Sequence, residues 1–259
     1  MTGSGNHESF YNWTAYTNRY KMPAEKSAGN GNFWFSYDYG NVHVTTINTE
    51  DCVDAECPMM LWLEKDLQAA VQNRLNVPWI VLSLHRPIYC SDDSASAGPG
   101  GKFQLALEPL LLKYDVDLVV QGHSHVYERI HPSENGVVSV KPTKTRSESG
   151  LVDLYQAEGK GPVYVVQGNT GAMQFERWHQ PAPEWSAVRF ANGYVPPSKP
   201  LSSASDHQAL EGLILNSNYT DTFGVAIATF SNSTHLHYSV VPVTGTIGKD
   251  EFWVVKRNL

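Results

Sequence analysis

The chain has 259 residues, of which 41% are hydrophobic, 17% charged and 11% aromatic, and it contains three cysteines. This composition indicates an ordered globular protein with a sizeable core and excludes a small scaffold held together by many disulfides. The net charge is −7 and the basic residues are scattered, so we expect no binding to nucleic acid. No run reaches 18 apolar residues and residues 1–6 do not resemble a signal peptide, so we expect neither a membrane span nor a leader.

The first half of the chain alternates between strand and helix patterns. Residues 33–48 form two β-rich runs separated by a Gly-Asn pair, which predicts a hairpin. Apolar residues recur at near-helical spacing over 58–74, with a proline suited to the first turn. Residues 78–84 are typical of a buried strand, 103–114 of a helix and 117–121 of a second buried strand. This order predicts a layered α/β arrangement with parallel strands.

The second half has a different character. Residues 163–167 predict one more apolar strand, whereas residues 176–206 are rich in Pro, Ser and aromatic residues without periodicity, as in a functional or covering loop. Three antiparallel strands are expected near the end, over 223–230, 235–241 and 252–255. We find no internal repeat, so residues 1–259 are expected to form a single domain, with 211–259 as its carboxy-terminal antiparallel strand region.

Glycosylation triplets and cysteines bear on the cellular compartment. Three triplets fit the acceptor pattern for N-glycosylation, at Asn12, Asn218 and Asn232. Such triplets also arise by chance, so they favour a secretory route only moderately. Cys52 and Cys57 lie in one acidic loop and can close a small ring, whereas Cys90 has no evident mate. On spacing alone, three ordinary reduced cysteines are an equally good interpretation.

Metal-binding side chains follow buried strands or stand at glycine turns in three segments. These segments are Gly5-Asn6-His7-Glu8, the strand-end His85, and Gly122-His123-Ser124-His125. Because ligands gather beyond the carboxyl ends of parallel strands, the three strand-end histidines should converge in one crevice. Imidazole nitrogens and an amide oxygen suit zinc, manganese or iron. Each segment alone is a weak signal, and His235 and His237 show the same spacing inside an ordinary strand pattern.

Taken together, these segments resemble the purple acid phosphatases of the metallophosphoesterase superfamily. The residues that carry the resemblance are 5–8, 85–89, 122–129, 161–169 and 232–237. Their order and approximate spacing match along essentially the whole chain. The resemblance implies a metallophosphoesterase-like α/β/β/α sandwich. This chain would form its second half, with mixed parallel strands followed by carboxy-terminal antiparallel strands.

The resemblance also implies a function and a ligand set. The implied reaction is hydrolysis of phosphate monoesters at acidic pH, by in-line attack of metal-bound hydroxide at a binuclear centre. In the family pattern, Asn6, His85 and His123 bind a divalent metal (zinc, manganese or iron), and His125 binds Fe(III). His7 is the implied catalytic residue, which contacts the phosphate or protonates the leaving alkoxide.

The same pattern assigns supporting roles and leaves ligands unaccounted for. Glu128 and Arg129 are expected to lie behind the site, supporting the ligands or forming an ion pair. In the family, the motifs Asp-x-Gly and Gly-Asp-x-x-Tyr supply a bridging aspartate and a tyrosinate ahead of the Gly-Asn-His-Glu motif, and five residues before Asn6 cannot hold them. We therefore expect this chain alone to hold at most one metal, weakly. A carboxy-terminal portion of a longer protein is favoured over a short, degenerate relative.

On this interpretation the substrate is a small phosphate ester. The missing amino-terminal segment or a second copy of the chain is the expected polypeptide partner. The expected location is secreted or extracellular, or else vacuolar or lysosomal. Two alternatives stay open: phosphodiester or nucleotide hydrolysis at the same centre, and a catalytically inactive extracellular glycoprotein that uses the scaffold for binding or assembly.

Overall fold

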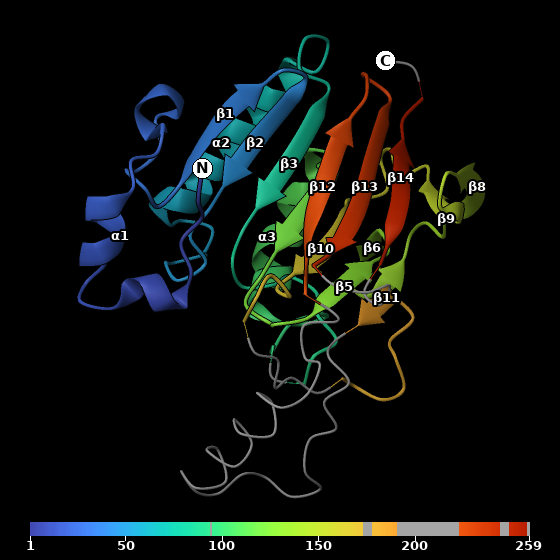
Figure 1. Ribbon diagram of the computed structural model, residues 1–259. Coiled ribbons are helices and arrows are strands. Elements are labelled where there is room, and N and C mark those ends of the chain that lie inside the picture. Colours follow the sequence, from blue (N-terminus) through green and yellow to red (C-terminus); the bar gives the residue numbers. More distant parts are fainter. Residues whose placement is uncertain (94, 173–177, 191–222, 244–248, 258–259) are drawn as a thin grey trace, which may run out of the picture.

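Two stacked β-sheets form the centre of the molecule (Figure 1). The computed structural model describes residues 1–93, 95–172, 178–190, 223–243 and 249–257. In spatial order, the seven-stranded sheet comprises β1 (Phe35–Tyr39), β2 (Val42–Thr46), β3 (Trp79–Ser83), β4 (Leu118–Gln121), β10 (Val163–Gln167), β5 (Tyr127–Ile130) and β11 (Ser186–Phe190). The five-stranded sheet comprises β12 (Gly224–Phe230), β13 (His235–Pro242), β14 (Glu251–Val255), β9 (Gly150–Tyr155) and β8 (Thr143–Ser147).

The remaining elements are short or lie on the surfaces of the sheets. A two-stranded ladder joins β6 (Ser133–Glu134) to β7 (Val137–Val138). The helices are η1 (Asn6–Ser9), α1 (Thr14–Arg19), η2 (Ala24–Ser27), α2 (Pro58–Gln72) and α3 (Lys102–Lys113), where η marks a 3-10 helix. Within the described parts of the chain, no helix is both long and apolar enough to cross a membrane.

Parallel pairing positions the candidate site. Strands β2, β3, β4 and β10 run parallel to one another, as the sequence predicts. Residues of β3 and β10 are buried on both faces, which explains their continuous apolar runs. The carboxyl ends of the parallel strands therefore meet along one edge of the sheet. Strands β1, β5 and β11 flank this group in antiparallel pairing.

Helices α2 and α3 cover one face of the seven-stranded sheet (Figure 1). Leu63 and Leu67 of α2 and Leu107 and Leu111 of α3 are fully buried and share one apolar core with β3, β4 and β10. Both helices follow the predicted apolar spacing, and Pro58 occupies the first turn of α2. Burial of each leucine side chain contributes about 2 kcal/mol.

A polar clamp ties α2 to the β1–β2 hairpin. His43 Nδ1 lies 2.7 Å from Asp38 Oδ1, and His43 Nε2 lies 3.1 Å from Asp66 Oδ2. Ser36 and Thr45 also donate hydrogen bonds to Asp66. Burial lowers the pKa of His43, but the two carboxylates outweigh it, so the pKa is raised above its ordinary value.

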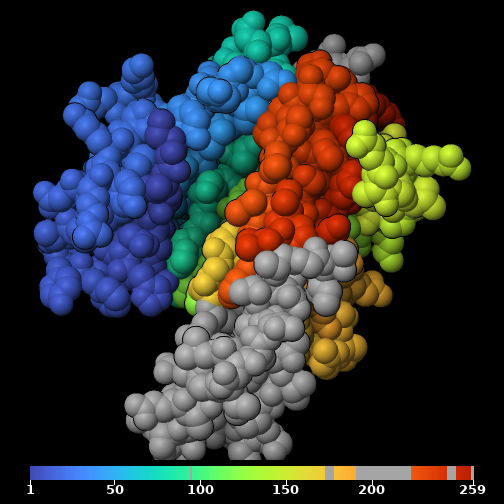
Figure 2. Space-filling model, in the orientation of Figure 1, coloured from blue at the N-terminus to red at the C-terminus, as the bar shows by residue number. Residues whose placement is uncertain are grey.

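The five-stranded sheet packs on the opposite face and completes a second core. This core joins side chains of β3, β4 and β10 with apolar residues of β13 and β14. Figure 2 shows β12 to β14, coloured orange to red, beside the blue amino-terminal part of the chain. On the outer side of this sheet Val225, Ile227 and Val241 remain exposed. Among the described residues, the helices that share a hydrophobic core with a sheet are α2 and α3, and both pack on the seven-stranded sheet.

Buried charges connect the two sheets. Arg129 on β5 forms ion pairs with Asp153 on β9 and with Asp250, each at 2.7 Å, and donates a 2.7 Å hydrogen bond to the Tyr155 hydroxyl. At the far end of the sheets, Lys256 pairs with Asp117 at 2.7 Å. These contacts satisfy charges that would otherwise be costly to bury.

Several sequence-based expectations need correction. Strands β5 to β9, over residues 127–155, were not predicted. The three carboxy-terminal strands β12, β13 and β14 pair in antiparallel fashion as predicted, and β14 also pairs in parallel with β9, which was not expected. The stretch 176–206, expected to be loop, contains β11 in its described part. Residues 211–222 of the expected carboxy-terminal region lie outside the described residues.

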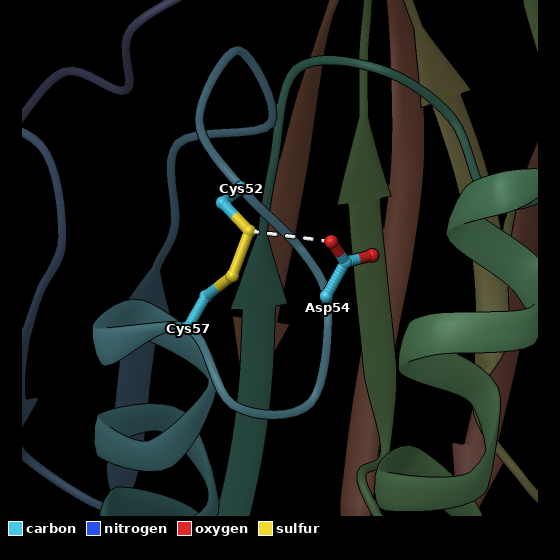
Figure 3. Close-up of side chains that lie close together, drawn as sticks. All are labelled: Cys52, Asp54 and Cys57. Atoms are coloured by element: carbon cyan, nitrogen blue, oxygen red, sulfur yellow. Dashed lines mark hydrogen bonds between the residues drawn. A yellow bond between two sulfur atoms is a disulfide. The ribbon is translucent and has the colours of Figure 1, made fainter.

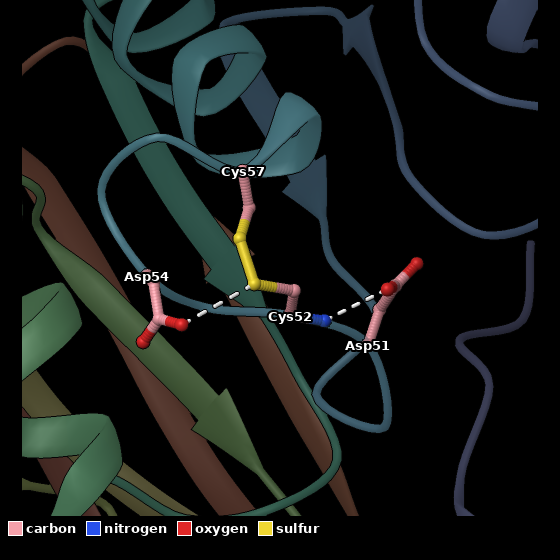
Figure 4. The surroundings of a disulfide bond; sticks show 4 residues. All are labelled: Asp51, Cys52, Asp54 and Cys57. Atoms are coloured by element: carbon pink, nitrogen blue, oxygen red, sulfur yellow. Dashed lines mark hydrogen bonds between the residues drawn. A yellow bond between two sulfur atoms is a disulfide. The ribbon is translucent and has the colours of Figure 1, made fainter.

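The acidic loop before α2 contains the expected disulfide. Cys52 and Cys57 are bonded, with Cα atoms 6.0 Å apart, and Cys57 caps the amino end of α2 (Figure 3). Asp51 Oδ1 accepts the backbone N–H of Cys52 at 2.7 Å, and an Asp54 carboxylate oxygen lies 3.6 Å from Cys52 Sγ (Figure 4). Because both sulfurs are in the disulfide, Cys52 and Cys57 offer no thiolate to a metal. Cys90 is free and buried, and burial raises the pKa of its thiol.

Candidate metal site

Three segments far apart in the sequence meet beyond the carboxyl ends of β3 and β4. His85 follows β3 and His123 follows β4, while Asn6 begins the short helix η1. The turn at Asn6 is fixed locally, because the Gly5 N–H donates to Glu8 Oε2 at 2.8 Å and the Glu8 N–H donates to the Gly5 carbonyl at 3.1 Å. Of the three strand-end histidines expected to converge, the structure brings His85 and His123 together, with Asn6 beside them.

The donor atoms of Asn6, His85 and His123 face one another. Asn6 Oδ1 lies 2.8 Å from His85 Nε2 and 3.3 Å from His123 Nδ1, and the two ring nitrogens are 3.2 Å apart. Donor atoms about 2.1 Å from one ion lie roughly 3.0–3.4 Å from each other in tetrahedral or octahedral geometry. Two sides of the triangle fall in this range and the third, at 2.8 Å, is slightly shorter, so the triangle is close to the size that a single bound cation requires. Its donor set suits zinc, manganese or iron.

Glycines allow the segments to approach so closely. A Cβ at Gly5 would lie 2.7 Å from the Cε1 and Nδ1 atoms of His85. A Cβ at Gly168, beyond β10, would overlap the backbone carbonyl of Ser124. His123 itself has a φ of 71°, in the left-handed region that side chains rarely adopt. The backbone therefore holds His123 in a strained conformation beside two glycine-dependent contacts.

The site keeps its histidines neutral. The pKa of His85 is lowered to about 4, chiefly by burial and next by the charge of the nearby His123. Burial also lowers the pKa of His123, followed by the positive charge of Arg86. Neutral imidazoles retain the lone pair that a metal ligand must offer. The lowered pKa values therefore favour, in both rings, the neutral form that can bind a metal.

His7 and His125 are not among the donors of the triangle. The His7 ring is exposed and packs edge-on against Phe10, with centroids 5.7 Å apart. Its charge contributes to the lowered pKa of His85. The charge of His125 similarly lowers the pKa of His123. The donor triangle joins neither residue, and the roles expected for them stay predictions.

Glu128 and Arg129 point to opposite sides of β5. The Glu128 carboxylate accepts hydrogen bonds from the Ser91 N–H at 2.7 Å, the Ser91 hydroxyl at 2.6 Å and the Ser186 hydroxyl at 2.5 Å. Burial raises its pKa. It thereby anchors the loop that leaves β3 through Ser91. Arg129 forms the ion pairs between the sheets, and its hydrogen-bond partners are Asp153, Tyr155 and Asp250. These contacts do not include a candidate ligand.

Sequence reasoning missed one charged pair at the site. Arg86 and Glu50 form a bidentate ion pair, and Arg86 Nη1 lies 3.3 Å from His123 Nε2. The only available signal was that Arg86 directly follows the candidate ligand His85. Of the glycosylation acceptors, Asn12 and Asn232 are exposed, and Asn218 lies outside the described residues. Their modification stays a prediction.

Comparisons with known proteins find similar phosphatases. Residues 2–127 match the model of the calcineurin-like phosphoesterase family. Acid phosphatase type 7 of Mus musculus is 35% identical over 209 residues, which cover 73% of this chain and 44% of that protein. Purple acid phosphatase 21 of Arabidopsis thaliana is 30% identical over 205 residues, covering 74% of this chain and 42% of that protein.

A solved structure shares the fold. Purple acid phosphatase PPD1 from yellow lupin seeds superposes with a TM-score of 0.73 at 23% identity, covering 99% of this chain and 40% of that one. The chain spans less than half the length of the curated relatives named above. Its mixed α/β fold, with parallel and antiparallel sheets, matches the purple acid phosphatase fold. Over residues 2–127 the chain therefore resembles the calcineurin-like phosphoesterases, and the relatives named above are acid and purple acid phosphatases.

Proposed function

We propose that this chain is part of an acid phosphatase that hydrolyses phosphate monoesters with the help of bound metal ions. The observation that carries the proposal is the triangle formed by Asn6 Oδ1, His85 Nε2 and His123 Nδ1, whose sides measure 2.8, 3.3 and 3.2 Å. Relatives named acid phosphatase that align over about three quarters of the chain support it.

In this proposal Asn6, His85 and His123 hold a divalent ion of zinc, manganese or iron, and His125 holds Fe(III). The three triangle donors are neutral and offset none of the charge of a cation, so the chain alone would hold at most one ion, weakly. A binuclear centre needs carboxylate ligands in addition. We infer that these come from polypeptide outside this sequence, because the relatives are more than twice as long as the matched region.

The residues of this chain have distinct tasks. When bound, the cations supply Lewis-acid stabilisation and activation of water for in-line displacement at phosphorus. Asn6, His85 and His123 orient the centre, because the glycine-dependent backbone fixes their donor atoms. We assign to His7, which is exposed and adjacent to Asn6 in the sequence, the task of holding a proton for the departing alkoxide or of contacting a phosphate oxygen.

We further propose that the protein is secreted or vacuolar and carries glycans. The Cys52–Cys57 disulfide suits an oxidising compartment, and the exposed Asn12 and Asn232 are accessible to glycosylation. Its substrate is a small phosphate ester, and its polypeptide partner is either the remainder of a longer protein or a second copy of the chain.

The test measures hydrolysis of p-nitrophenyl phosphate at about pH 5 by metal-loaded protein that includes any polypeptide beyond this sequence. Removing a positioned metal ligand or general acid typically lowers the rate by 10²–10⁴. We therefore expect a loss of that order in His85→Ala. The exposed His235→Ala should retain full activity as the matched control. Preferred hydrolysis of bis(p-nitrophenyl) phosphate would instead establish phosphodiesterase chemistry, and activity that survives both chelation and His85→Ala would refute the proposal.

A further inference from the structure

Arg86 is a fixed cation at the candidate site that the ligand set leaves unused. Its Nε lies 2.7 Å from Glu50 Oε1 and its Nη2 lies 2.9 Å from Glu50 Oε2. This two-pronged contact occupies one edge of the guanidinium. The remaining nitrogen, Nη1, points to the site, 3.3 Å from His123 Nε2.

The protein, not solvent, sets the direction of this side chain. The Arg86 N–H donates to Thr49 Oγ1 at 2.9 Å, and Glu50 is held by its own N–H, which donates to Asn48 Oδ1 at 3.1 Å. The Glu50 side chain is 14% exposed and that of Arg86 is 32% exposed. The guanidinium is therefore anchored by Glu50, and the Arg86 side chain remains partly exposed.

The contact between Arg86 and His123 is compatible with the metal-free ring only. A guanidinium can donate hydrogen bonds but cannot accept them. If His123 offers the lone pair of Nδ1 to a cation, its proton resides on Nε2, which then cannot accept from Arg86 Nη1. A bound cation thus removes the acceptor that the described residues offer to Nη1 at the edge of the site.

We propose that Arg86 is a phosphate-binding residue of this site and that Glu50 is a positioning residue which keeps the guanidinium turned toward it. The inference rests on the proposed phosphatase function. The acceptor that replaces the imidazole is an oxygen of the phosphate group, since guanidinium and phosphate form strong charge-assisted hydrogen bonds.

A different role for Arg86 makes the opposite prediction about metal binding. If Arg86 served only to orient His123, its loss would weaken the metal. If it binds phosphate, its loss removes a positive charge from beside the cation, and metal affinity stays equal or improves. The two roles separate when metal and phosphate affinities are measured independently.

The experiment uses calorimetric titration in two stages. Metal-free protein is titrated with Zn²⁺, and the Zn²⁺-loaded protein is then titrated with inorganic phosphate. In Arg86→Met, which keeps the apolar stem, we expect the phosphate Kd to rise about 10- to 100-fold while the Zn²⁺ Kd does not rise. Arg86→Lys and Glu50→Gln should give smaller losses of phosphate affinity, because each retains a cation but not the two-pronged contact. Lys65→Met, an exposed residue of α2, is the control for net charge.

Each outcome decides between the possibilities. Wild-type protein that binds Zn²⁺ but no phosphate would overturn the proposed function, and the role of Arg86 with it. Wild-type protein that binds phosphate no more tightly than Arg86→Met and Arg86→Lys would overturn the role of Arg86 alone. A rise in the Zn²⁺ Kd that matches the rise in the phosphate Kd would reassign Arg86 to positioning His123.

Discussion

Replacing Arg129 with methionine tests whether this buried arginine joins the two sheets or supports the metal ligands. Its side chain is 2% exposed, and its guanidinium reaches Asp153, Tyr155 and Asp250 at 2.7 Å each. Methionine replaces part of the volume but leaves the Asp250 carboxylate, 7% exposed, with the Tyr127 hydroxyl at 2.7 Å as one remaining donor. Removing one partner of such a buried network costs about 3–5 kcal/mol.

The assay is urea unfolding at neutral pH, with Lys144→Met as the matched control. Lys144 pairs with the same Asp153 at 2.6 Å, but its side chain is 62% exposed. An exposed pair contributes at most about 1 kcal/mol, so the control isolates the effect of burial. We expect Arg129→Met to lose several times more unfolding free energy than Lys144→Met, without a change in Zn²⁺ affinity.

Two results would refute this reasoning about Arg129. A loss no larger than that of Lys144→Met would mean that the buried network contributes little to stability. A Zn²⁺ affinity lowered about 10- to 100-fold in protein that is still folded would assign Arg129 to the support of the metal ligands.

Two further predictions concern pH dependence and backbone approach. The raised pKa of His43 stabilises the fold fully below the unfolded value of about 6.5, and this contribution is lost as the pH rises through the higher folded value. His43→Gln should therefore lower the unfolding free energy more at about pH 5 than at about pH 8, and an equal loss at both would contradict the clamp. Gly5→Ala should displace the His85 ring and weaken Zn²⁺ binding at least tenfold, whereas Gly3→Ala, whose Cβ would meet its nearest atom at 3.4 Å, should not. Equal Zn²⁺ affinity in these two glycine variants would show that the approach at Gly5 is not needed.

The parts of the site that follow strand ends were predictable from the sequence. His85 and His123 each follow a short apolar strand, and parallel neighbours must end at the same edge of a sheet. Asn6 was found through the resemblance of its motif, not through periodicity. The Cys52–Cys57 ring was one of two interpretations that spacing allowed, and the structure confirms it.

Contacts made by buried charges were not predictable. Strand β5 contains Glu128 and Arg129, whose polar side chains break the apolar pattern, yet both are buried because partners from other elements satisfy them. The Glu50–Arg86 pair spans 36 residues and has no local signature. Such pairings depend on tertiary packing, which single-sequence patterns do not encode.

The proposed phosphatase function depends most directly on the cation that Asn6, His85 and His123 are proposed to share. The decisive measurement is calorimetric titration of metal-free protein comprising these 259 residues with Zn²⁺. We predict one weakly bound ion in the wild type, a Zn²⁺ affinity lowered at least tenfold in His85→Ala, and an unchanged Zn²⁺ affinity in His235→Ala. No binding by the wild type, or equal affinity in all three proteins, would contradict it.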